Sequence, residues 1–315
     1  MLRAMTRREW LGAAIGTAAG AAAARLARGG DAGAGTGGPA PAASAAAGTM
    51  ATAAGPALRD IPPYALYVFD NGLIGPDVPT IEAKVALAKK LGFAGMTDHF
   101  AARRLAQVLD ALDKQGLEFA SLYSTPLVEA EIDARLKDDI ALLRGRRARI
   151  EIAFSSKQFK PSDPAADGRA TDAIKRVADW CGDSGPVVSI YPHRNSWTER
   201  TEDGVRLARK VGRPTVGTNL NLVHWQWVTP VRPLEELLAE ALPHLMLVTI
   251  NGLDKGKIVP LSDGDFDVAA FMAAVKKSGY KGPVGLQCYS IPGESEAHLA
   301  KSMAKWREIR KQAGL

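Results

Sequence analysis

The chain has 315 residues, 46% of them apolar, which is enough to bury a sizeable core as one large domain or two small ones. The formal net charge is +6, but the first 50 residues carry five arginines against Glu9 and Asp31, which leaves about +3 for the remainder. That surplus is too small to favour a nucleic-acid partner. The densest basic run, at residues 144–149, is typical of a solvated turn.

The N-terminal segment resembles a twin-arginine export signal. Arg7 and Arg8 lie in the stretch TRREWL, and an Ala/Gly-rich apolar run follows at residues 10–24. This run is shorter than the ~20 residues that a transmembrane helix needs. We therefore expect a signal region at residues 1–30, a low-complexity linker at 31–58, and a periplasmic or otherwise exported protein. It would use the twin-arginine export machinery and keep no stable membrane anchor; a disordered Ala-rich tail is the alternative.

From residue 64 onward, short apolar runs alternate with amphipathic segments. The expected strands are 64–70, 93–98, 118–123, 149–154, 186–192, 215–221, 245–250 and 283–289. The expected helices are 80–91, 102–115, 128–143, 170–182, 200–211, 233–242, 267–278 and 294–313. Eight strands alternating with eight helices are typical of an α/β protein with a (β/α)₈ TIM barrel, here a single domain at 59–315. The rival, a doubly wound open sheet, would more often show a Gly-rich turn after its first strand, and FDNGLIGPDV at 69–78 is no dinucleotide fingerprint.

The two cysteines lie more than a hundred residues apart. Cys181 falls at an expected helix end and Cys288 inside an expected strand. An exported protein can form a disulfide, but this placement favours two buried free thiols.

The five histidines sort by their place in the expected barrel. His99, His193 and His224 follow the second, fifth and sixth strands, whereas His244 precedes the seventh strand and His298 lies on the last helix. Because sites in this fold lie at the C-terminal ends of the strands, the first three are expected at one mouth.

Four stretches resemble the sugar phosphate isomerase/epimerase family of xylose isomerase-like barrels. They are VSIYPHRN, TEDGVRLARKVGRPTVGTNLNLVHW, PLSDGDFD and YKGPVGLQCY, and the resemblance covers about residues 64–315. It implies a divalent metal bound by two glutamates, an aspartate and a histidine, which polarises the substrate while the glutamates move a proton. In this sequence the four ligand positions fall on Tyr191, Asn221, Thr249 and Gln287. His224 matches a family histidine that usually contacts substrate.

All four implied metal ligands are therefore replaced. Asn221 and Gln287 are the amides of the acids they replace, with similar shape but no charge. A hard dication prefers anionic oxygen, so we expect no cofactor, and the sequence disfavours a divalent metal. An unconventional metal site remains open, since Asp70, Asp98 and Asp254 lie near the mouth, with Glu151 as a fourth acid. Adjacent residues such as Asp98 and His99 point to opposite faces of a strand, which weakens that alternative.

The sequence thus predicts a neutral mouth rich in hydrogen-bonding groups, with aromatic rings and two lysines nearby. Such a lining suits a small-molecule carbohydrate, which needs apolar contact for its C–H faces and partners for its hydroxyls. The candidate catalytic residues are His193 and His224. The candidate substrate-binding residues are Tyr191, Asn219, Asn221, Asn251, Gln287, Trp197, Trp225, Lys255, Lys157, Asp98 and His99, with Trp227 close by in sequence.

The favoured interpretation is a sugar isomerase/epimerase-like enzyme that transfers a proton next to a carbonyl group, with imidazoles in place of the metal-bound pair. Isomerisation, epimerisation and elimination or hydration all pass through an enolate-like intermediate, so the sequence does not separate them. A non-catalytic sugar-binding barrel and a metal-dependent isomerase with an unconventional site are the alternatives. The sequence carries no signal for the oligomeric state.

Overall fold

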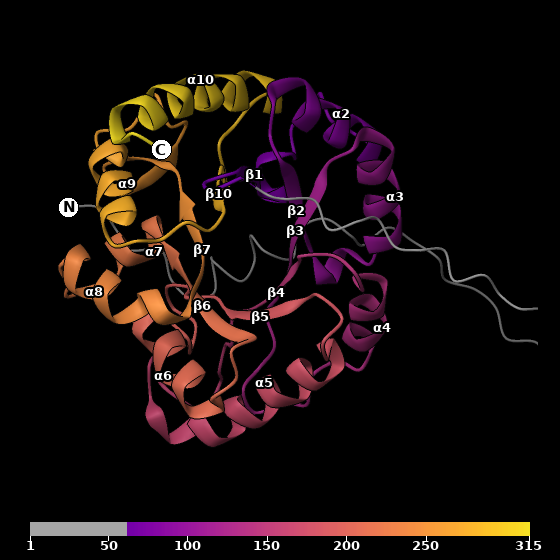
Figure 1. Cartoon of the computed structure of the whole chain (residues 1–315), viewed down its shortest axis with the longest axis vertical. Helices are drawn as coiled ribbons and strands as arrows, with labels where there is room; N and C mark the ends of the chain where they lie inside the picture. The colour runs from indigo at the N-terminus through magenta and orange to yellow at the C-terminus, as the bar shows by residue number, and fades with distance from the viewer. Residues whose placement is uncertain (1–61) are drawn as a thin grey trace, which may run out of the picture. The chain divides into compact units, whose positions relative to one another are not determined.

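The computed structural model describes residues 62–315, and these form a closed barrel of eight parallel strands. Going around the barrel, the order is β1, β10, β7, β6, β5, β4, β3, β2 (Figure 1). The strands are β1 (Leu66–Val68), β2 (Gly95–His99), β3 (Glu118–Ser124), β4 (Arg149–Ile152), β5 (Val187–Ile190), β6 (Val216–Asn221), β7 (Leu245–Ile250) and β10 (Val284–Leu286). All eight expected strands are confirmed, and the open-sheet alternative is wrong.

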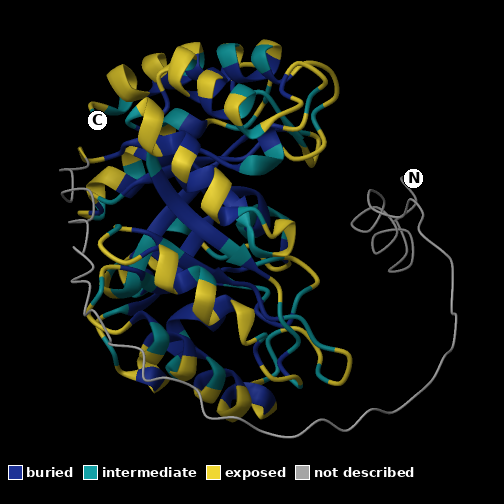
Figure 2. Cartoon of the chain, turned by 90° about the vertical axis from the view of Figure 1, so that its right-hand side faces the viewer, coloured by how far each residue is buried: buried dark blue, intermediate teal, exposed yellow. Residues whose placement is uncertain are grey.

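The helices form a ring outside the barrel (Figure 1). They are α2 (Ile81–Leu91), α3 (Leu105–Gln115), α4 (Arg135–Leu142), α5 (Asp167–Cys181), α6 (Thr201–Val211), α8 (Leu234–Ala241), α9 (Val268–Lys277) and α10 (Ser295–Ala313). Their outer faces are exposed while the strands inside are buried (Figure 2). Within residues 62–315 no helix is both long and apolar enough to cross a membrane.

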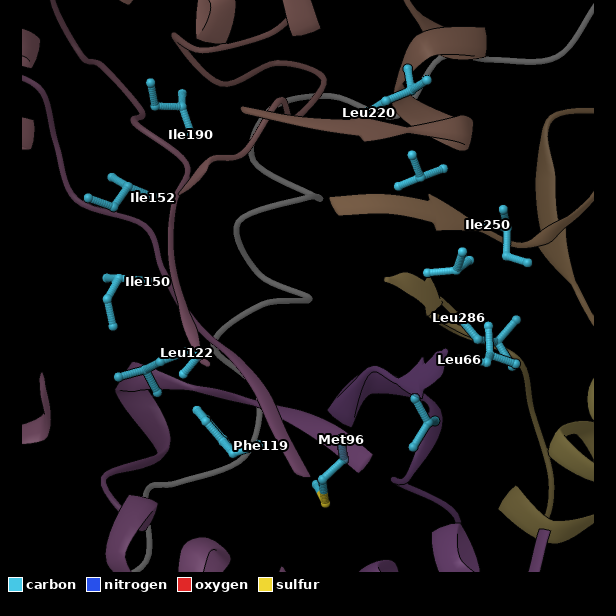
Figure 3. Packing of buried hydrophobic residues seen from close by; sticks show 14 of the residues in the cluster. Leu66, Met96, Phe119, Leu122, Ile150, Ile152, Ile190, Leu220, Ile250 and Leu286 are labelled. Carbon is cyan, nitrogen blue, oxygen red and sulfur yellow. The ribbon is translucent and has the colours of Figure 1, made fainter. Parts of the chain in front are cut away.

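Side-chain alternation along the strands separates two layers. Ile152, Ile190, Leu220 and Leu286 belong to the apolar layer shared with the helices, part of which is drawn in Figure 3. Because neighbours on a strand point to opposite faces, the residues next to them point into the barrel. That inner face is polar at many positions, and its alternation with the outer layer fixes which side chains meet at the mouth.

Three parts of the structure differ from the sequence-based expectation. Helix α4 begins at Arg135 instead of residue 128, because the Glu129 carboxylate accepts backbone N–H groups of Lys157 and Gln158 and so ties this segment to the loop after β4. A short helix, α7 (Leu222–Trp227), directly follows β6. An antiparallel hairpin of β8 (Gly252–Asp254) and β9 (Lys257–Val259) follows β7.

Cys181 and Cys288 are both buried and unbonded to each other, as expected. The expected signal region and linker, residues 1–30 and 31–58, lie outside the described residues.

Arg104 neutralises the buried Asp98 carboxylate near the end of β2. Its guanidinium lies 2.6 Å from Asp98, and the exposed fractions of the two side chains are 26% and 1%. Replacing Arg104 with alanine should lower the free energy of unfolding by about 2–3 kcal/mol, because the buried Asp98 carboxylate loses its ion-pair partner. The expected loss is limited because the Arg104 side chain is itself partly exposed. Urea denaturation measures this change.

Arg135→Ala is the matched control, since its ion pair with Asp133 is largely exposed and solvent screens it, so its loss should change stability little. The double variant Arg104→Ala/Asp98→Asn should recover most of the lost stability. Equal losses in Arg104→Ala and Arg135→Ala would contradict the buried-charge explanation.

Candidate functional site

The Tyr191 hydroxyl lies at the centre of a hydrogen-bonded cluster at the C-terminal mouth of the barrel. Tyr191 follows β5 and is 3% exposed. Its oxygen accepts a hydrogen bond from Asn221 Nδ2 at 2.6 Å and another from Gln287 Nε2. Thr249, which pairs with Asn221 across β6 and β7, is buried, and its hydroxyl has no hydrogen-bond partner among the described residues. Three of the four positions that the resemblance assigns to metal ligands are thus joined through one phenolic oxygen.

Backbone groups fix which end of each amide faces Tyr191. Asn221 is the N-cap of α7, and its Oδ1 accepts the His224 N–H at 3.1 Å, so Nδ2 must face the phenol. Asn71 Oδ1 likewise accepts the Cys288 N–H, which turns Asn71 Nδ2 toward Gln287 Oε1. The Gln287 Nε2 group therefore faces Tyr191. Both amides donate to the phenolic oxygen because each uses its own oxygen elsewhere.

His193 and His224 form a pair of imidazoles above this cluster, with ring centroids 4.2 Å apart. The backbone of Arg194 contacts both rings. Its N–H donates to His224 Nδ1 at 3.3 Å, and its carbonyl oxygen lies 2.9 Å from His193 Nδ1. Since a carbonyl only accepts, His193 Nδ1 carries a proton, and since an N–H only donates, His224 Nδ1 carries a lone pair.

The two neutral rings are therefore opposite tautomers. His193 presents a lone pair at Nε2, and His224 presents an N–H at Nε2. Burial lowers the pKa of His193 to about 4. Burial, together with the nearby His193 and Arg194, lowers the pKa of His224 well below its usual value. Both imidazoles are consequently neutral at pH 7, and one can accept a proton while the other can donate one.

The turn between β5 and α6 holds His193 in place. His193 accepts the Ser196 N–H through its carbonyl, and Asn195 adopts the left-handed conformation with φ 67°. Asn is one of the few non-glycine residues that tolerate this conformation. The carboxylate of Glu199 accepts the Asn195 N–H at 3.0 Å and closes the turn.

One layer deeper, a second polar cluster is centred on Glu151. Asn219 Nδ2 donates to Glu151 Oε1 at 2.8 Å, and the Ser189 hydroxyl donates to Asn219 Oδ1. All three side chains are fully buried. Burial raises the pKa of Glu151 to about 7, although the Asn219 hydrogen bond and the positive charge of Arg149 act in the opposite direction. Asn219 therefore organises the barrel interior below Tyr191.

Two of the tryptophans expected to contact a sugar pack elsewhere. Trp197 is 1% exposed, stacks edge-on with Phe154, and donates its indole N–H to the Asp163 carbonyl. Trp225 packs against Phe266 and Phe271 in the helix layer, and its N–H donates to the Arg232 carbonyl. The expectation that these two rings face the mouth is wrong, because each N–H is satisfied by a loop carbonyl away from it.

Trp227 is the indole that lies beside the histidine pair. Its ring centroid is 5.6 Å from that of His224, and the Arg194 guanidinium lies 5.8 Å from the ring. The α7 helix produces this arrangement, since it turns the chain after Asn221 so that His224 and Trp227, three residues apart, share one face. The sequence pattern H-x-x-W at helical spacing carried this signal, but only if residues 222–227 were read as a helix.

The two candidate lysines are both exposed. Lys255 lies in the turn of the β8–β9 hairpin with φ 47°, and Lys157 lies in the loop whose backbone donates to Glu129. The adjoining Gly256 approaches the indole nitrogen of Trp227, which puts the hairpin turn next to that ring. Lys255 thus lies at the rim and Lys157 outside the mouth cluster.

The remaining candidates occupy both faces of their strands. Asp98 shares the helix-facing side of β2 with Met96 and is taken up by Arg104, so it does not face the mouth. His99 points the opposite way, as expected, and its ring lies 5.2 Å from Tyr123, which in turn contacts Tyr191. Asn251 is buried, and its Nδ2 donates to the Gly252 carbonyl at 2.8 Å.

In residues 62–315, no group of three or more His, Cys, Asp or Glu side chains is arranged to hold a metal ion.

Solved structures with the same fold include several sugar epimerases. D-Allulose 3-epimerase from Methylomonas sp. superposes with a TM-score of 0.65 at 16% identity, over 80% of this chain and 99% of that one. L-Ribulose 3-epimerase gives 0.65 at 14% identity, over 80% and 96%. 3-Keto-D-glucoside 4-epimerase from E. coli gives 0.63 at 15% identity, over 79% and 99%. At these identities the likeness establishes the fold.

No curated protein sequence matches this chain. A family model, described as a xylose isomerase-like TIM barrel, matches residues 85–309, which is most of the described barrel. The match agrees with the closed eight-stranded barrel of the described residues. The chain therefore belongs to the family of xylose isomerase-like TIM barrels.

Proposed function

We propose that this protein is a sugar isomerase- or epimerase-like enzyme that moves a proton on a carbon next to a carbonyl group, with His193 as the base and His224 as the hydrogen-bond donor. The observation that carries the proposal is that the Arg194 backbone contacts both rings, with its carbonyl at His193 Nδ1 and its N–H at His224 Nδ1, from which the opposite tautomers follow. Membership of the family and the likeness to D-allulose and L-ribulose epimerases support a sugar or keto-sugar as substrate.

The proton transfer follows from the two ring nitrogens that face away from Arg194. His193 Nε2 takes the proton from the carbon, and the electron pair of the C–H bond moves toward the carbonyl oxygen. The Nε2–H of His224 donates a hydrogen bond to that oxygen as negative charge develops. An isomer forms when the former carbonyl carbon receives the proton while the proton of the adjacent hydroxyl passes to the former carbonyl oxygen. An epimer forms when the same carbon receives a proton from solvent on the face opposite His193, which then gives its own proton to solvent.

The low pKa of His193 limits the kinds of substrate from which this residue can remove a proton. A base with a pKa of about 4 is weak at neutral pH, so it removes a proton only from a carbon whose enolate is strongly stabilised. Hydrogen bonds to the substrate oxygen must therefore supply much of the rate acceleration. Trp227 beside His224 offers the apolar face that the C–H side of a sugar requires.

Solvent-exchange NMR tests the proposal. Incubation of the protein with a panel of aldoses, ketoses and keto-glycosides in D₂O should place deuterium on the carbon next to the carbonyl of at least one compound. Exchange without net conversion would still show proton transfer, since the proton on His193 exchanges with solvent. Sugars that bind but neither exchange nor convert would contradict the enzyme and support a non-catalytic sugar-binding barrel, which the neutral mouth also fits.

The paired arginines at positions 7 and 8 support a further part of the proposal, export of the folded protein by the twin-arginine route. Fractionation of cells that express the full chain would test it, and replacement of both arginines by lysine should retain the protein in the cytoplasm.

A further inference from the structure

The Tyr191 hydroxyl occupies the point on which three of the four family-implied metal-ligand positions converge. Tyr191 itself stands at one of these positions, and the side chains of two others, Asn221 and Gln287, donate to its oxygen. Thr249, at the fourth position, lies next to Asn221 in register and is buried. The point of convergence is thus filled by the Tyr191 hydroxyl, which the side chains of Asn221 and Gln287 hold in place.

This set of groups does not fit a divalent cation. A hard dication needs lone pairs of anionic or carbonyl oxygens directed at it. Here both amides direct N–H hydrogens at the shared point, and their orientation is fixed by the backbone N–H groups of His224 and Cys288. A positive potential at this point stabilises electron-rich oxygen and repels a cation.

The arrangement also determines where the phenolic proton points. Both hydrogen bonds that the described residues make with the Tyr191 oxygen are accepted by it, so its O–H must be directed elsewhere. Two N–H groups on the oxygen draw electron density from it and strengthen the O–H as a donor. Burial raises the pKa of Tyr191 well above its usual value, so the proton stays on the oxygen at neutral pH.

We propose that Tyr191 is a catalytic residue that takes the place of the family's divalent metal, with its O–H donating a hydrogen bond to the substrate oxygen on which negative charge develops. The ring centroids of His193 and His224 lie 6.4 and 6.0 Å from that of Tyr191, so the three groups lie within the span of a single sugar. This inference rests on the proposed proton transfer by the histidine pair, and it supplies the oxyanion stabilisation that a weak base requires.

Tyr191→Phe tests the hydroxyl while keeping the ring and its edge-on contact with Tyr123. Turnover or deuterium exchange should fall by about 10²–10³-fold, with the dissociation constant of the sugar changed much less, because the donated bond strengthens as charge develops. Tyr67→Phe is the matched control. It removes another buried phenolic hydroxyl, which lies in the lower barrel and has no hydrogen-bond partner among the described residues, so activity should stay near that of the unmodified protein.

Gln287→Glu keeps the hydroxyl but changes its partner. The new carboxylate oxygen would face the phenol and accept its proton in a hydrogen bond, so the O–H is no longer directed at the substrate. The expected result is a loss of turnover comparable to that of Tyr191→Phe. Circular dichroism and thermal unfolding establish that each variant is folded, and a folded Gln287→Glu variant with full activity would overturn the inference.

Manganese titration gives a second, independent reading. After chelation, the unmodified protein should bind no stoichiometric Mn²⁺ up to about millimolar concentration, as followed by electron paramagnetic resonance, because hydrogens face the site. One equivalent of tightly bound Mn²⁺ that is displaced by a sugar would overturn the inference even without turnover.

The failures of the two proposals are distinguishable. An unmodified protein that turns over no sugar refutes the proposed function. An active unmodified protein whose Tyr191→Phe variant keeps its turnover within about twofold refutes the role of Tyr191 and leaves the histidine pair intact.

Discussion

Replacement of His193 by alanine should reduce turnover by about 10²–10⁴-fold while sugar binding is largely retained, because the substitution removes the proposed base and leaves the hydrogen-bonding floor of the mouth in place. His224→Ala should have a similar effect, since it removes the proposed donor. Steady-state kinetics and calorimetric titration of a sugar measure the two quantities. His244→Ala is the matched control, because His244 precedes β7 at the opposite end of the barrel.

The pH dependence provides a sharper test of the same pair. A base must be unprotonated, and the pKa of His193 is lowered to about 4, so kcat/KM should be nearly constant from about pH 5.5 to 8 and fall only as the pH approaches 4. An unperturbed histidine would instead give half of the maximal rate near pH 6.5. Full activity in His193→Ala, or a profile that breaks near pH 6.5, would contradict the proposed base.

Glu151→Gln should make folding stability less sensitive to pH. Burial raises the pKa of Glu151 from 4.5 to about 7, so the folded protein holds this proton more tightly than the unfolded chain. Stability from this group is therefore present below pH 4.5 and lost as the pH rises to about 7. A shift of that size corresponds to roughly 3 kcal/mol, and the glutamine variant should be more stable than the unmodified protein at pH 8 by an amount approaching it.

The geometry of the buried cluster suits the neutral substitution. Glutamine Oε1 can still accept from Asn219 Nδ2, and its amide group can donate to the Ser121 hydroxyl, which lies beside the Glu151 carboxyl. The lowered pKa values of His193 and His224 make the folded protein less stable as the pH falls. This effect is the same in Glu151→Gln and in the unmodified protein. Urea unfolding between pH 4.5 and 8 measures the difference.

Glu308→Gln, on the exposed side of α10, is the matched control and should leave the pH dependence of stability unchanged. If the Glu151→Gln curve runs parallel to that of the unmodified protein across this range, the buried carboxylic acid is not responsible for the pH dependence.

The barrel was predictable because each strand and helix of its repeat can be recognised from the residues within that element. Each β-strand is a short apolar run, and helices such as α2 and α3 end at Gly92 and Gly116, which adopt the left-handed conformation that glycine favours. The start of α4 was not predictable in this way. Its boundary depends on Glu129 accepting N–H groups from residues 28 and 29 positions away, and no local periodicity reports such a contact.

The candidate site was predictable only as far as the strand ends define it. The rule that sites lie after the strands correctly brought His193, His224, Tyr191, Asn221 and Gln287 together. The roles of Trp197 and Trp225 depend on which way each loop turns, which sequence spacing does not specify. The opposite tautomers of the histidine pair likewise depend on the backbone of Arg194 and become visible only in three dimensions.

The N-cap of α7 has a consequence for how this site could change during evolution. The cap requires only a side-chain oxygen at position 221 to accept the His224 N–H, and asparagine and aspartate perform that task about equally well. An exchange between amide and carboxylate at this position therefore leaves α7 and the position of His224 intact. The helix separates local folding from the chemistry of the mouth, so a lineage can pass between the two kinds of site without first losing the loop that presents the histidine.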